Sequence, residues 1–123
     1  MSFVAADPLQ HLGEVVDSGH CMRHVQIVAG VPHSSKLRRG ANVREAKLAT
    51  GTVVGTFNDA GRYANATDGS SHVAVLIRQD PEGLVVIDQW VGQPVHERVV
   101  RFKAGHGPAC DDGDRYFIVE SVA

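Results

Sequence analysis

The sequence is poor in aromatic residues and cysteines, and it has no long hydrophobic run. Aromatic residues make up 6% of the 123 residues, and two cysteines are too few for a disulfide-rich scaffold. The longest apolar runs, such as residues 73–77, fall well short of the roughly 20 residues of a membrane-spanning helix. We therefore expect no membrane insertion, and we expect residues 1–123 to form a single domain.

The chain also lacks an excess of positive charge. Twelve Lys and Arg residues stand against fourteen Asp and Glu residues, and the formal net charge is −2. Because binding to nucleic-acid phosphates requires clustered positive charge, we expect no nucleic-acid partner. Residues 1–7 show no basic segment followed by an apolar stretch, so we expect no signal peptide and synthesis in the cytoplasm.

The predicted elements run from helices to strands. Asp7 and Pro8 predict a short helix to about Val16, and Ser18 is the predicted cap of a second helix that stops before Gly30. Residues 31–50 are predicted to be irregular and basic, with one helical turn near 43–48. Strands are predicted at 52–57, 72–78, 84–91, 97–102 and 115–122. This order indicates an α+β fold, with N-terminal helices packed on a small antiparallel sheet of about five strands.

The most informative pattern is a cysteine at the start of a helix, followed by a histidine and an aspartate on consecutive strands. Cys21 lies in the first turn of the second predicted helix, where free N–H groups and the helix dipole lower a thiol pKa. His72 enters its strand from a glycine- and serine-rich loop and is the candidate proton carrier. A thiol and an imidazole in this order indicate nucleophilic catalysis on an amide.

Asp88 is the candidate that orients His72. If the turn at 80–83 joins an antiparallel hairpin, His72 lies opposite about Trp90, and Asp88 is then a diagonal neighbour on the same face. An aspartate bonded to one ring nitrogen leaves the other nitrogen free to act as a base. A register slip of one residue would place Asp88 on the opposite face.

Four segments in this order resemble a known family. They are Ser18–Cys21, Gly51–Phe57, Ser71–Val75 and Val86–Val91. Together they are similar to NlpC/P60-type papain-like amidases, and more closely to the small amidase effectors of bacterial type VI secretion, in particular their third family. The resemblance covers the chain from about residue 16 to residue 119 and implies a papain-like NlpC/P60-type domain.

The resemblance implies a cysteine peptidase that cuts peptidoglycan peptide stems at the crosslink between D-alanine and meso-diaminopimelate. By position, it makes Cys21 the nucleophile, His72 the general base and Asp88 the third catalytic residue. It also implies delivery by the type VI apparatus into the periplasm of a target bacterium, and a cognate immunity protein as inhibitor. No cofactor is expected.

Other interpretations of the same residues remain open. The spacing of His20, Cys21 and His24 permits zinc ligation, but no CxxC or HExxH pattern accompanies it, so we expect no metal site. Cys110 lies in a loop, and a disulfide between Cys21 and Cys110 would block the nucleophile. A papain-like domain without catalytic activity, binding cell-wall peptide or a partner protein, is the alternative function.

The candidate substrate-binding residues flank the catalytic pattern. Trp90 lies two residues after Asp88 and is either a core residue or a wall of the cleft, and His20 is expected on the rim. The loop 58–71 and the segment 33–42 are the expected walls of the groove, because loops on a rigid scaffold usually carry recognition.

Overall fold

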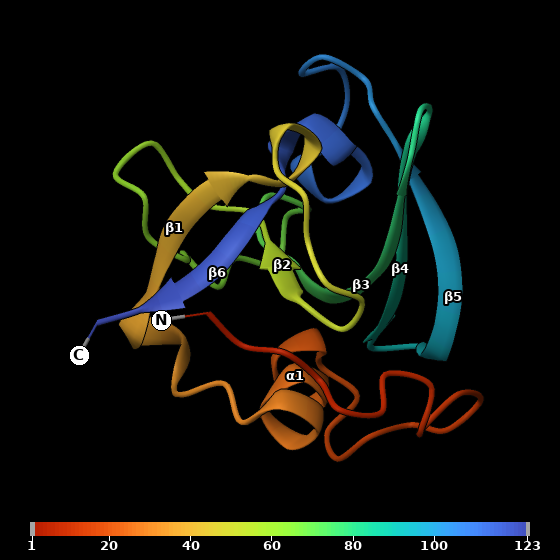
Figure 1. Cartoon of the computed structure of the whole chain (residues 1–123). Helices are drawn as coiled ribbons and strands as arrows, with labels where there is room; N and C mark the ends of the chain where they lie inside the picture. The colour runs from red at the N-terminus through yellow and green to blue at the C-terminus, as the bar shows by residue number, and fades with distance from the viewer. Residues whose placement is uncertain (1, 123) are drawn as a thin grey trace.

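The computed structural model describes residues 2–122 as one twisted antiparallel sheet with a single α-helix on one side. The helix is α1 (Cys21–Ala29), and the strands are β1 (Leu37–Asn42), β2 (Val53–Gly55), β3 (Val73–Asp80), β4 (Gly83–Trp90), β5 (Gln93–Arg101) and β6 (Phe117–Ser121). The strand order is β1-β6-β2-β3-β4-β5. Figure 1 shows α1 against one side of the sheet and the turns of residues 109–115 on the other. Within residues 2–122, no helix is both long and apolar enough to cross a membrane.

The central strands are buried on both faces, which explains their continuous apolar sequences. On one face, Val53, Val75 and Ile87 pack with Met22 and Val25 of α1. The alternate residues on the other face belong to a second cluster, made of Val43, Val54, Ala74, Leu76, Leu84, Val86, Val100 and Tyr116. The sheet is therefore a rigid layer between two cores, and β3 and β4 at its centre position the side chains described below.

The expected N-terminal pair of helices is wrong, because only the second helix forms. Residues 8–16 make isolated turns, and the backbone groups of Gly13 and Glu14 pair instead with Val95 at the edge of β5. A helix of about nine residues is marginal on its own, so pairing with a strand competes successfully. The second helix starts at Cys21 with His20 as its N-cap instead of Ser18, and it ends at the left-handed Gly30 as predicted.

The sheet has six strands, one more than expected. The segment predicted to be irregular contains β1, which pairs with β6 through residues such as Leu37 and Ser121. Its sequence, LRRGAN, lacks the apolar alternation that marks a strand, because β1 lies at the edge of the sheet. Charged residues such as Arg38 and Arg39 are common on edge strands, where they discourage pairing with other chains.

Candidate active site

Cys21 is the first residue of α1, and its position is fixed by the loop before it. Gly19 has a φ of 86° and closes a turn onto the carbonyl of Val16, a conformation that favours glycine. The buried side chain of Gln89 in β4 holds this loop from behind. It accepts from the Val16 N–H at 2.9 Å and donates to the Val16 and His20 carbonyls at 2.9 and 3.0 Å. The start of the helix is thereby attached to the centre of the sheet.

His72 lies at the entrance to β3 and is fixed by backbone contacts. Its N–H donates to Oγ1 of Thr56 at 2.9 Å, and its carbonyl accepts from the Thr56 N–H at 2.9 Å. Strands β2 and β3 approach closely at Gly55, where a Cβ atom would lie 3.1 Å from the His72 carbonyl oxygen and 2.9 Å from Cγ1 of Val73. The imidazole therefore projects from a backbone with little freedom to move.

Asp88 of β4 contacts His72 as the hairpin register predicted. Val75 pairs with Ile87, a register that places His72 opposite Trp90. Nε2 of His72 lies 2.7 Å from Oδ2 of Asp88, and the aspartate is completely buried. The contact between the predicted histidine and the predicted aspartate is confirmed, and it leaves Nδ1 of His72 for the thiol.

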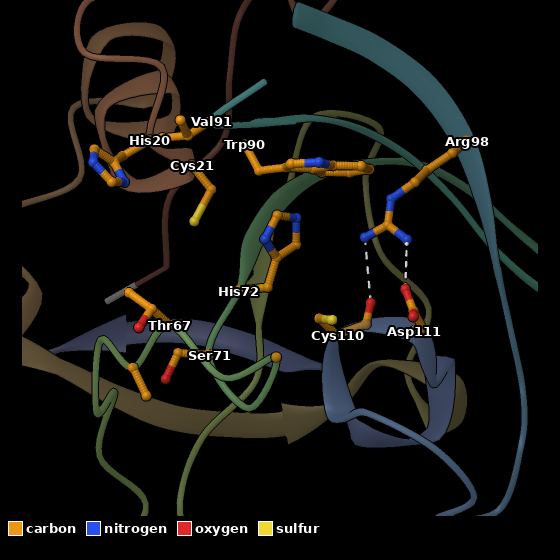
Figure 2. A pocket seen from close by; sticks show the side chains of 12 residues that line it. His20, Cys21, Thr67, Ser71, His72, Trp90, Val91, Arg98, Cys110 and Asp111 are labelled. Carbon is orange, nitrogen blue, oxygen red and sulfur yellow. Dashed lines mark hydrogen bonds and ion pairs between the residues drawn. The ribbon is translucent and has the colours of Figure 1, made fainter. Parts of the chain in front are cut away.

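Cys21 and His72 face each other across the pocket in Figure 2, and each changes the proton affinity of the other. Burial raises the pKa of the Cys21 thiol, but the hydrogen bond and charge of His72 outweigh burial, so the thiol pKa falls below its ordinary value. Burial lowers the pKa of His72, but its hydrogen bonds with Asp88 and Cys21 outweigh burial and raise it to about 9. The arrangement favours a thiolate beside an imidazolium.

Tyr63 and Arg98 also contact the three candidate catalytic residues Cys21, His72 and Asp88. The hydroxyl of Tyr63 lies 3.7 Å from the sulfur of Cys21, and burial, with the nearby thiol, raises the tyrosine pKa. Nε of Arg98 donates to Oδ2 of Asp88 at 2.8 Å. Burial raises the pKa of Asp88, but the contacts with His72 and Arg98 outweigh burial and hold it below its usual range. Asp88 is therefore a carboxylate, and Tyr63 is a neutral hydroxyl.

A pocket of about 460 Å³ opens over Cys21 and His72 (Figure 2). His20 and Trp90 both line it, at the positions expected for substrate contacts. Trp90 is 41% exposed and packs edge-on against His72, with ring centroids 6.1 Å apart, so it is a wall of the pocket and not a core residue. The other lining residues are Ala66, Thr67, Gly69, Ser71, Val91, Arg98, Cys110 and Asp111.

The loop 58–71 forms a wall of the pocket as predicted, whereas the segment 33–42 does not line it. That segment contains β1, which lies at the far edge of the sheet from β4 and β5. The expectation for 33–42 is therefore wrong, because pairing with β6 holds this segment away from the helix start.

The two histidines that the sequence offered as zinc ligands do not share one site. His20 lines the pocket, whereas His24 is buried, and burial lowers the His24 pKa to about 4. Within the described residues 2–122, no three His, Cys, Asp or Glu side chains are grouped as metal ligands. Cys21 and Cys110 are both free thiols.

Sequence reasoning missed three side chains that build the site, namely Tyr63, Gln89 and Arg98. Arg98 was detectable in principle, because it lies in β5 two residues beyond His96, the partner of Asp88 across the strands. A register count through the second hairpin places Arg98 diagonal to Asp88. Tyr63 comes from an irregular loop and Gln89 binds backbone groups, so neither position carries a periodic signal.

Comparison with known proteins gives consistent results. The model of a family described as domesticated amidase effector 2 matches residues 2–119. A type VI secretion amidase effector 2 protein from Salmonella typhi is 33% identical over 132 residues, covering 96% of this chain and 97% of that protein. A solved structure of type 6 secretion amidase effector 2 (Tae2) is similar with a TM-score of 0.81 and 30% identity, covering 98% of this chain and 95% of that chain.

Proposed function

Because the chain belongs to the type VI secretion amidase effector 2 family, we propose that it is a cysteine amidase that hydrolyses peptidoglycan peptide stems. The membership corrects the expectation of the third effector family. The observation that carries the proposal is the thiol of Cys21 at the start of α1, facing a histidine that is bonded to a buried aspartate. The family is also a different one from NlpC/P60, and a cysteine at the start of α1 that faces a histidine of the sheet supports only a papain-like order of the catalytic residues.

In the first half-reaction, the Cys21 thiolate attacks the carbonyl carbon of the substrate amide. The first N–H groups of a helix have no intrahelical acceptor, so those at the start of α1 donate to the oxyanion that forms. Nδ1 of His72 gives its proton to the leaving nitrogen, the C–N bond breaks, and a thioester on Cys21 remains. The Asp88 carboxylate stays ionised, and its bond with Nε2 of His72 holds the imidazole in place.

In the second half-reaction, Nδ1 of the now neutral His72 takes a proton from water, and the hydroxide oxygen attacks the thioester carbon. The C–S bond breaks, which releases the new carboxylic acid and returns the Cys21 thiolate, and the acid then loses its proton to solvent water. The proton on His72 restores the starting ion pair.

The D-alanine–meso-diaminopimelate crosslink was expected from the resemblance to the third effector family. After the correction to the second family it stays the proposed bond, and the product masses of the experiment below decide it. The pocket supports a peptide substrate, because it is open, mixed in polarity and bordered by the aromatic face of Trp90 and the loop 58–71. We further propose that the type VI apparatus delivers this single domain into the periplasm of a target bacterium as an antibacterial toxin. A cognate immunity protein would then block the pocket in the producing cell.

Digestion of purified diaminopimelate-type sacculi tests the proposal. Wild type, Cys21→Ala and the matched control Cys110→Ala are each incubated with sacculi, and the soluble products are separated and weighed by mass spectrometry. We expect wild type and Cys110→Ala to convert crosslinked dimers to monomers and Cys21→Ala to leave them intact. The product masses identify the bond.

The alternative function makes the opposite prediction. A catalytically inactive papain-like module would leave sacculi undigested in all three proteins while still sedimenting with them. A folded, reduced wild type that gives this result would replace the enzyme proposal with the binding module.

A further inference from the structure

Arg98 is a mostly buried cation that shares one carboxylate oxygen with the candidate catalytic histidine. Its Nε lies 2.8 Å from Oδ2 of Asp88, and Nε2 of His72 lies 2.7 Å from the same oxygen. The Arg98 side chain is 18% exposed and Asp88 is not exposed at all. The two cationic groups therefore contact one buried negative charge from different strands.

The guanidinium of Arg98 is fixed on its other sides as well. It donates from Nη1 to Oδ1 of Asp111 at 3.3 Å and from Nη2 to the carbonyl of Cys110 at 3.2 Å, contacts that Figure 2 marks. That carbonyl also accepts from the hydroxyl of the buried Tyr116 at 2.7 Å. The guanidinium carbon lies 5.2 Å from the ring centroid of Trp90. These contacts leave the side chain little freedom to turn away from Asp88.

The need for a second cation follows from the catalytic cycle. His72 is positively charged before it protonates the leaving nitrogen and neutral afterwards. A fully buried carboxylate with no cationic partner is costly, and it would take up a proton instead. Arginine is always charged at working pH, so Arg98 still balances Asp88 when His72 is neutral.

We propose that Arg98 is a positioning residue that keeps Asp88 ionised throughout the cycle and thereby sets the pH at which His72 releases its proton. The inference rests on the proposed function through the role of His72. Without Arg98, Asp88 would hold the imidazolium proton too tightly, because the permanent positive charge beside its carboxylate would be gone.

The test must separate the effect of Arg98 on the His72 pKa from the effects of the other charged groups nearby. His72 and Asp88 are faced by the following titratable or charged side chains: Cys21 and His24 of α1, Tyr63 of the loop, His96 and Arg98 of β5, and Cys110, Asp111 and Tyr116 near the turns at 109–115. Among these, Arg98 alone combines a permanent positive charge with a direct bond to Asp88.

The first test measures the titration of His72 by NMR and needs no substrate. It uses Cys21→Ala as the background, which removes the coupled thiol. We expect Arg98→Gln to raise the His72 pKa by roughly one unit, because loss of a nearby positive charge favours the imidazolium. Arg98→Lys keeps the charge and should shift it less. The matched control is Arg101→Gln, an exposed arginine of the same strand that pairs with Glu82, and it should cause no shift.

A second pair of variants covers the case in which Arg98→Gln does not fold. Asp88→Asn leaves the Arg98 charge unbalanced near His72, so the His72 pKa should fall below its ordinary value. Asp88→Asn combined with Arg98→Gln removes both charges and should bring the His72 pKa back up. An unchanged His72 pKa on removal of Arg98, in either background, would overturn the inference.

The activity profile supplies an independent readout. In the Cys21-containing enzyme, Arg98→Gln should shift both limbs of the pH dependence of kcat/KM to higher pH. Arg98→Lys should lower kcat/KM, with a smaller shift of the two limbs. A purely structural role for Arg98 predicts a lower rate with both limbs unmoved. Because the NMR titration is independent of the substrate, failure of peptidoglycan digestion and failure of this inference give different results.

Discussion

Gln89 of β4 donates from its side-chain amide to the backbone carbonyl of His20, the residue immediately before Cys21, at 3.0 Å. The same amide binds both backbone groups of Val16, so one buried side chain replaces the backbone pairing that this loop lacks. The nucleophile is thus located relative to His72 and Asp88 by a neighbour of Asp88 on the same strand.

Replacing Gln89 by alanine should destabilise the fold and misplace the nucleophile. The substitution removes three hydrogen bonds and leaves the Val16 N–H without a partner, whereas the Val16 and His20 carbonyls keep the N–H groups of Gly19 and Arg23. We expect a loss of about 2–4 kcal/mol in the free energy of unfolding. Urea unfolding measures the loss, and kcat/KM should fall as well. The control is Gln93→Ala, whose amide makes a single half-buried bond with Pro94. Equal effects of the two substitutions would contradict the anchoring role.

The two cysteines should differ in their reaction with iodoacetamide. Burial raises the pKa of the Cys110 thiol, with Asp111 adding to the effect, whereas His72 lowers that of Cys21. We therefore expect Cys21 to be alkylated roughly tenfold faster than Cys110 near pH 6.5, since the thiolate is the reactive form. Peptide mass spectrometry after timed quenching assigns each site. His72→Ala should remove most of the difference, and the exposed control His106→Ala should preserve it.

The dependence of stability on pH should reveal the ion pair. In the folded chain His72 has its pKa raised from 6.5 to about 9, and Cys21 has its pKa lowered from 9.0. Between pH 6.5 and 9, folded His72 binds more protons than in the unfolded chain, and folded Cys21, whose pKa is lowered, binds fewer. The two differences offset each other, so we expect little dependence of the wild-type stability on pH from 6.5 to 8.5.

Cys21→Ala removes one side of this balance. Burial lowers the His72 pKa, and we expect Asp88 alone to keep it raised in this variant, so that its contribution is fully present below pH 6.5 and is lost as pH rises. The free energy of unfolding of the variant should therefore fall with pH above 6.5, by at most about 1.4 kcal/mol per unit. Urea unfolding at pH 6, 7 and 8 checks this. A variant as insensitive to pH as the wild type would argue against a protonated His72.

Trp90 should contribute to substrate binding. Its ring is 41% exposed in the pocket wall, and we expect Trp90→Ala to raise KM about tenfold with a smaller change in kcat. Steady-state kinetics on crosslinked muropeptide dimers gives both constants, and Val99→Ala, another exposed residue of the hairpin, is the control. Trp90 is the only tryptophan, so its fluorescence in Cys21→Ala also measures binding directly. A lower kcat at constant KM would assign Trp90 to another role.

The sequence predicted the structure correctly where a periodic apolar pattern and chemically distinctive residues occur together. The apolar runs of β3 and β4 predicted the hairpin and the contact between His72 and Asp88, which is confirmed, but not the β-bulge between Leu76 and Arg78 that shifts the register by one residue. The predictions for residues 8–16, expected to be a helix, and for residues 37–42, expected to be irregular, were wrong for one physical reason. At both places, pairing with a strand distant in the sequence decides the structure, and such pairing leaves no local pattern.

The candidate site shows the same limit. Cys21 and His72 could be identified because their residue types and local positions carry chemical meaning. Gln89 could not, since its importance arises only when the sheet brings β4 and the loop before α1 together, and Arg98 is found only by a register count through the second hairpin. Residues that support others through the sheet require the complete register.

The order of strands has a consequence for how the molecule assembles. β6 lies between β1 and β2, so residues 37–42 and 53–55 have no common neighbour until residues 117–121 are in place. The hairpins that carry His72 and Asp88 can pair early because their contacts are local in sequence, whereas closure of the other half requires contacts across about 80 residues. A ribosome must therefore synthesise and release nearly the whole domain before the sheet is complete. Folding of this half is expected to be the slow step, and truncation before residue 117 would leave β1 without its partner strand and β2 paired only with β3.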